Sequence, residues 1–167
     1  GADIALYDEQ TQSLWHAPRS DLVLQKESEG IRGDLLLNLD FGGQVRPLRA
    51  TAFYQAQSER VDMSILLDRL VPAELAALAP ELKSLAVANL PVSGSIAFAI
   101  GGDRKLSEIR LQLDGGKGTL VLPELYTQPV AVDRAVFKGA LAADFSGLRV
   151  LEAVVESAGM RLAAEGN

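Results

Sequence analysis

The sequence predicts a mainly β fold, a long curved antiparallel meander sheet with one short helix near residues 72–79. Apolar and polar residues alternate with period two along most of the chain, as is typical of half-buried strands. Gly-rich turn signals separate the alternating segments, so consecutive strands should pair as antiparallel hairpins. No run of helices alternates with the strands, which excludes a doubly wound α/β fold.

The predicted strands are short and closely spaced. In order they cover residues 2–7, 31–41, 48–54, 61–68, 92–100, 106–114, 119–122, 130–141, 148–155 and 160–164. Turn signals lie at residues 40–43, 101–103, 114–116 and 145–147. In the second strand Leu35, Leu37 and Leu39 share a face, and Leu36 interrupts the polar alternation on the other side. We therefore do not expect the side chains on that polar side to be fully exposed to solvent.

A helix is expected between Leu70 and Pro80. Pro72 suits a first helical turn, Glu74 favours the positive end of the helix dipole, and Pro80 should end the run. A helix of two turns is marginal alone, so we expect it to pack its leucines on the sheet. A helix that merely covers the core is favoured over a functional lid.

The chain is expected to be a single domain over residues 1–167, excised from a longer protein because it begins and ends within strand patterns. A strand-rich half covers residues 2–68, the helix and a bridge cover 69–91, and a second strand-rich half covers 92–165. The bridge is apolar, which indicates packed structure and not a flexible linker.

Composition excludes several function classes. The 167 residues carry a net charge of −6 and 5% aromatics, which argues against binding nucleic acid. There is no cysteine, so disulfides and thiolate chemistry are absent. The longest apolar runs, 75–79 and 96–100, are far shorter than the roughly 20 residues of a membrane span. We expect no transmembrane span in this chain.

Motifs for catalysis are weak. His16 is the only histidine, placed in a loop or at a strand end, and no Gly-x-Ser-x-Gly elbow accompanies it. A surface or edge histidine is therefore favoured over a catalytic one. The acidic residues show no calcium-loop spacing. Residues 115–119 look like a phosphate loop, but a strand follows them, so we expect a hairpin turn. We predict no enzyme, no catalytic residue, no metal site and no cofactor.

The apolar strand faces leave two interpretations open. On the residues alone, a filled sandwich core with strands covered by the helix is favoured. The alternative is a curved sheet whose concave aliphatic face is incompletely filled and accepts acyl chains. Periodicity does not separate a filled concavity from an empty one.

Segments 75–82, 90–96 and 111–118, followed by 120–123 and 128–130, resemble the middle of AsmA-like, YhdP-type bacterial envelope proteins. Residues 2–7 and 15–18 fit the same pattern less specifically. The likeness covers nearly the whole chain. It rests on strand rhythm and a Pro-Val-Ser-Gly sequence at residues 91–94, and not on catalytic residues.

The resemblance implies a bridge-like lipid transfer protein. Such proteins are anchored in the inner membrane of Gram-negative bacteria and extend through the periplasm as a taco-shaped β-sheet. Their hydrophobic groove carries phospholipids towards the outer membrane. This chain would be one segment of that conduit, with phospholipid and the neighbouring repeats of the full-length chain as partners.

On this hypothesis the alternation selects the residues that line the groove and bind lipid. They are Leu35, Leu37, Leu39, Ala50, Ala52, Met63, Ile65, Ile96, Phe98, Leu111 and Leu113. The alternative function is a structural module that pairs with neighbouring repeats through its end strands, 2–7 and 160–164. An esterase or glycosidase ranks third, because it would depend on His16 or on an acid pair in a pocket.

Overall fold

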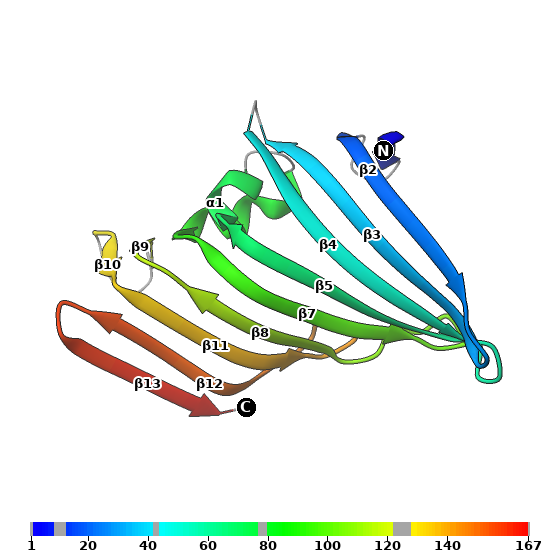
Figure 1. The fold of residues 1–167 in the computed structure, drawn as a ribbon. Helices are drawn as coiled ribbons and strands as arrows, with labels where there is room; N and C mark the ends of the chain where they lie inside the picture. Colours follow the sequence, from blue (N-terminus) through cyan, green and yellow to red (C-terminus); the bar gives the residue numbers. More distant parts are fainter. Residues whose placement is uncertain (1, 9–12, 42–43, 77–79, 122–127, 167) are drawn as a thin grey trace.

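The computed structural model describes residues 2–8, 13–41, 44–76, 80–121 and 128–166. Within them, ten strands form one antiparallel sheet and three short strands form a second (Figure 1). In spatial order the large sheet contains β1 (Ala2–Asp8), β2 (Ser13–Lys26), β3 (Gly30–Phe41), β4 (Gln44–Gln55), β5 (Arg60–Leu70), β7 (Val92–Ile100), β8 (Ile109–Gly115), β11 (Arg134–Leu141), β12 (Leu148–Ser157) and β13 (Met160–Gly166). The small sheet has the order β10 (Val130–Val132), β9 (Gly118–Leu120) and β6 (Ala88–Asn89). The predicted mainly β antiparallel meander is confirmed.

The large sheet is open and follows chain order. Its outermost strands are β1 and β13, which do not pair with each other in the described part of the chain. Strand directions rotate progressively from β2 to β13, as expected of a twisted sheet (Figure 1). β5 pairs directly with β7, so the two strand-rich halves belong to one continuous sheet.

The sequence pattern missed strand β2, and the placement of His16 in a loop or at a strand end was wrong. His16 lies inside β2, opposite Ala5. Residues 13–20 of β2 pair with β1 and residues 21–26 pair with β3. The first part of this strand lacks clear alternation. It is a strand because it pairs with its neighbours, and not because it has a hydrophobic period of its own.

The helix is shorter than predicted. α1 covers Pro72–Leu75, with Pro72 at its start and Glu74 in its first turn, as expected. Residues 77–79 of the predicted helix lie outside the described residues. Pro80 does not end the segment, because the 3₁₀-helix η1 (Pro80–Val87) begins there. Proline lacks an N–H and suits the first residue of a helix as well as the position after its end.

The turn at residues 115–119 is not a hairpin. β9 pairs with β10 and β6 instead of β8, so the chain leaves the large sheet at this point. Gly116 N donates to the Pro91 carbonyl at 2.8 Å. A Cβ at Gly118 would collide with Leu90, so glycine permits the close approach of the two segments. The predicted strand 130–141 likewise divides into β10 and β11.

Buried apolar side chains are few and scattered. Among the described residues they are Leu70, Leu90, Ala99, Val132, Ala140 and Val154. No second large sheet faces the first within these residues. The filled sandwich favoured by the residues alone is therefore wrong for the described part of the chain, which forms one large open sheet.

Candidate functional site

Strand register divides the large sheet into an apolar face and a polar face. Directly opposed residues of antiparallel strands share a face, so a row can be followed from strand to strand. One row crosses β2, β3, β4, β5, β7 and β8 and consists of Leu22, Leu35, Ala50, Ile65, Ile96 and Leu111. We call the side that carries this row the apolar face.

The adjacent rows are also apolar. The next row contains Leu24, Gly33, Ala52, Met63 and Phe98. On the other side of the first row, Gly94, Leu113, Phe137 and Ala153 oppose one another. Leu37 pairs with Leu48 and lies two residues from Leu35, hence on the same face.

The register therefore brings the residues predicted to line a groove onto a single face. Leu39 pairs with Arg46 in the same ladder, but its side chain lies outside the described part of the structure. For the other ten, the alternation of each strand and the pairing between strands agree. Whether these residues bind lipid stays a prediction.

The ten described side chains are half-buried, neither sealed in a core nor fully exposed. Exposure rises at the two edges of the apolar face, to 60% for Leu22, 65% for Leu24 and 68% for Leu162. No other layer of the described chain covers the middle of this face. A contiguous, partly exposed apolar surface of this kind is typical of an interaction or ligand-binding site.

One end of the apolar face is covered by the segment between β5 and β7. Gly115 pairs with Val92 and Ala135 on this face, and a Cβ there would collide with Cδ1 of Leu90. Leu90 is only 4% exposed. Figure 1 shows α1, β9 and β10 at this same end of the strands. We call the described part of this covering segment, residues 71–76 and 80–91, the cap.

A cavity of about 580 Å³ lies at the opposite end of the strands, where β2, β3 and β4 meet. Its apolar lining comes from Leu24, Ile31 and Tyr54, and Ile31 opposes Tyr54 in the sheet. Polar groups in its lining come from the end of β2 and from the β2–β3 turn, including Lys26 and Glu27. The cavity therefore joins apolar surface to a polar edge.

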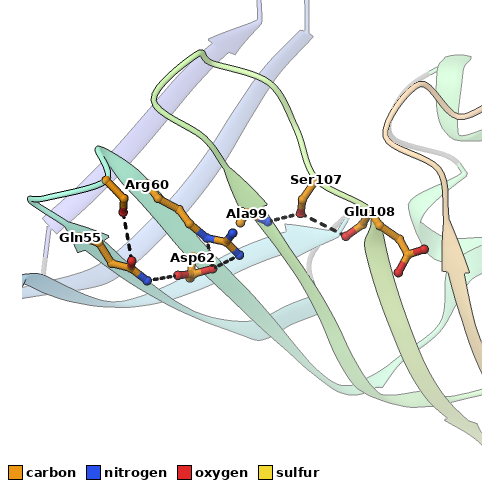
Figure 2. Close-up of polar contacts among 7 residues, drawn as sticks. Gln55, Arg60, Asp62, Ala99, Ser107 and Glu108 are labelled. Atoms are coloured by element: carbon orange, nitrogen blue, oxygen red, sulfur yellow. Dashed lines mark hydrogen bonds and ion pairs between the residues drawn. The ribbon is translucent and has the colours of Figure 1, made fainter.

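The polar face carries paired charges. Figure 2 shows Asp62 accepting hydrogen bonds from Gln55 Nε2 at 2.7 Å and from Arg60 Nη2 at 2.8 Å. Lys138 Nζ lies 2.7 Å from Glu152 Oε2. The hydrogen bond from Lys138 lowers the pKa of Glu152, and the same contact raises the pKa of Lys138. These contacts neutralise charge on the solvent side.

The hydrogen bonds of the Ser107 side chain to described residues are with backbone atoms only. The Ser107 hydroxyl accepts from Ala99 N at 2.7 Å and donates to the Glu108 carbonyl at 3.2 Å, so it stabilises a loop (Figure 2). The side chain of His16 lies outside the described residues. No group of three or more His, Cys, Asp or Glu side chains in the described ranges could hold a metal ion. No described helix is long and apolar enough to cross a membrane.

Sequence reasoning missed part of the apolar face on β2 and β4. Leu22 and Leu24 belong to the strand that the pattern did not identify, and Tyr54 was placed in a strand but not in the site. The signal was present in the Leu-Val-Leu run at residues 22–24, which is flanked by polar residues. A short run of this kind is ambiguous without its pairing partners.

Comparisons of the chain with models of known families, with curated proteins and with solved structures find no match.

Proposed function

We propose that this chain is a non-enzymatic segment of a periplasm-spanning lipid conduit, in which the apolar face binds the acyl chains of phospholipids. One observation carries the proposal. Ten half-buried apolar side chains lie in continuous rows across β3, β4, β5, β7 and β8, and no other layer of the described chain covers the middle of this face.

The chemistry of such a surface suits a moving cargo. Burial of each CH₂ group contributes about 0.8 kcal/mol and has no directional requirement. An acyl chain can therefore shift from one row to the next without breaking hydrogen bonds. The paired charges of the polar face suit contact with water.

The proposed setting depends on the resemblance to AsmA-like proteins. The periplasmic location, the anchoring of a full-length protein in the inner membrane, and transport towards the outer membrane all come from that likeness. The open edges of the sheet at β1 and β13 are compatible with continuation into neighbouring repeats.

The proposal is tested by placing a charge on either side of one strand. Ile65 lies on the apolar face of β5, whereas its neighbour Leu66 opposes Arg49 on the polar face and is 48% exposed. Native mass spectrometry with lipid extraction would be applied to the purified protein and to Ile65→Asp and Leu66→Asp. Circular dichroism would establish that each variant is folded.

We expect phospholipid on the unaltered protein and on Leu66→Asp, and reduced loading on Ile65→Asp. Equal loading of both folded variants would refute the assignment of the face. A protein that carries no phospholipid and refuses added phospholipid would refute the function.

A second candidate function is a structural module that pairs through its edge strands. The observation in its favour is the exposure of β13, where Met160 is 67% and Leu162 is 68% exposed at the outer edge of the sheet. Strand addition at such an edge would join copies or repeats. Self-association in light scattering without bound lipid would favour this candidate over the conduit.

A further inference from the structure

We propose that Lys26 binds the anionic headgroup of a phospholipid whose acyl chain lies in the cavity between β2, β3 and β4. The inference rests on the proposed function and adds a headgroup class to it. It comes from the distribution of charge on the apolar face, which the sequence pattern did not reveal because β2 was not identified.

Lys26 is exceptional in its position. It opposes Ile31 in the register and follows Leu22 and Leu24 along the same face of β2. Among the residues that the register pairs on the apolar face and whose side chains are described, it is the only charged one. Among its described side chains the face therefore presents one cation and no carboxylate, in a chain of net charge −6.

The surroundings leave that cation without a counter-ion. Lys26 has no ion pair with any described residue. The acid beside it at the cavity, Glu27, is held by Arg32, whose Nε donates to Glu27 Oε1 at 2.8 Å. Arg32 lies on the polar face, opposite Phe53. Of the two charged residues in the cavity lining, Glu27 is thus compensated by Arg32 and Lys26 has no such partner among the described residues.

The cavity fits both the apolar and the charged part of an amphiphile. Leu24, Ile31 and Tyr54 supply apolar wall, and Lys26 stands at the rim where the strands end. The cap covers the apolar face at the other end of the strands, near Gly115. A chain that enters at the cavity can extend along the row towards Met63 and Phe98, and its headgroup stays at the rim.

The preference for an anionic headgroup that one exposed cation provides is modest. Exposed ion pairs contribute roughly 0.2–1 kcal/mol, which corresponds to a preference of up to about fivefold for an anionic over a zwitterionic headgroup. Salt should weaken the preference, because exposed charges are screened. Total lipid loading should depend on the apolar face and should change little.

The test measures headgroup preference separately from loading. The protein would be incubated with vesicles of equal parts phosphatidylglycerol and phosphatidylcholine, and bound lipid would be counted by native mass spectrometry. Lys26→Gln removes the cation, Lys26→Arg keeps it, and Lys117→Gln removes an exposed charge far from the cavity as a matched control.

We expect the unaltered protein, Lys26→Arg and Lys117→Gln to favour phosphatidylglycerol by up to about fivefold. Lys26→Gln should bind the two lipids about equally, with total loading retained. An unchanged preference in loaded Lys26→Gln overturns the headgroup site but leaves the conduit intact. Absence of both lipids from the unaltered protein overturns both proposals. Inorganic phosphate should not displace the lipid, and displacement would assign Lys26 to a free anion instead.

Discussion

Substitution of Gly115 by alanine should destabilise the protein by pressing a methyl group into the cap. The added Cβ would collide with Cδ1 of Leu90 and would stand 3.2 Å from Cβ of Ala135. Leu90 is 4% exposed, so its side chain does not move aside freely. The backbone of Gly115 does not have the positive φ that alanine disfavours. The cost is therefore one of packing.

The magnitude follows from the contact. Overpacking of a filled site costs about 1–3 kcal/mol. Leu90→Ala alone should cost about 2–5 kcal/mol, because it removes a buried leucine. In the double variant the methyl group added at position 115 would occupy space that the leucine has left. The two changes should therefore cost less together than their sum, by about 1–3 kcal/mol.

Urea unfolding of the unaltered protein, Gly115→Ala, Leu90→Ala and the double variant measures the coupling energy between the two positions directly. Thermal melts should shift in parallel, by about 2–4 °C per kcal/mol for a chain of this size. Gly147→Ala is the matched control, since nothing lies within 4 Å of its added Cβ, and it should be neutral or slightly stabilising. Additive costs, or equal effects of Gly115→Ala and Gly147→Ala, would refute the placement of the cap on the apolar face.

Two further predictions concern the strands. Gly94 has φ 145°, and a Cβ there would collide with the Gln112 carbonyl of the adjacent strand. Gly94→Ala should therefore destabilise the protein by about 1–3 kcal/mol or more and accelerate amide exchange in β8. Unchanged amide exchange in β8 would contradict this packing. Because Lys138 lowers the pKa of Glu152 in the folded protein, their contact stabilises above the unfolded pKa and its contribution is lost as the pH falls through the folded pKa. Lys138→Ala should therefore raise the pKa of Glu152 towards its ordinary value in a carboxyl NMR titration, and an unmoved pKa would assign the shift to another cause.

Local alternation was enough to predict much of the sheet. The strand predicted at residues 92–100 has the same bounds as β7, and the residues of β3, β4, β5, β7 and β8 that were predicted to line a groove share a face as the period of two requires. The edges of the sheet were also anticipated, since β1 and β13 are its outermost strands. The alternation that predicts these features depends only on residues close together in the chain.

The segments that the sequence did not predict correctly, β2 and residues 115–119, have a common cause. β2 has little alternation of its own and becomes a strand by pairing with β1 and β3. Residues 115–119 have the composition of a hairpin turn, yet contacts with Leu90 and Pro91 divert the chain into another sheet. In both places, partners distant in sequence outweigh the local signal.

The sequence alone therefore established the composition of each face: aliphatic on one side of the strands and largely polar on the other. It did not establish what covers the aliphatic side, because a filled core and an open face have the same period of two. Only the pairing of distant strands shows that the described chain covers this face at one end, with Leu90 against Gly115. The same pairing brings Lys26 to the cavity at the other end.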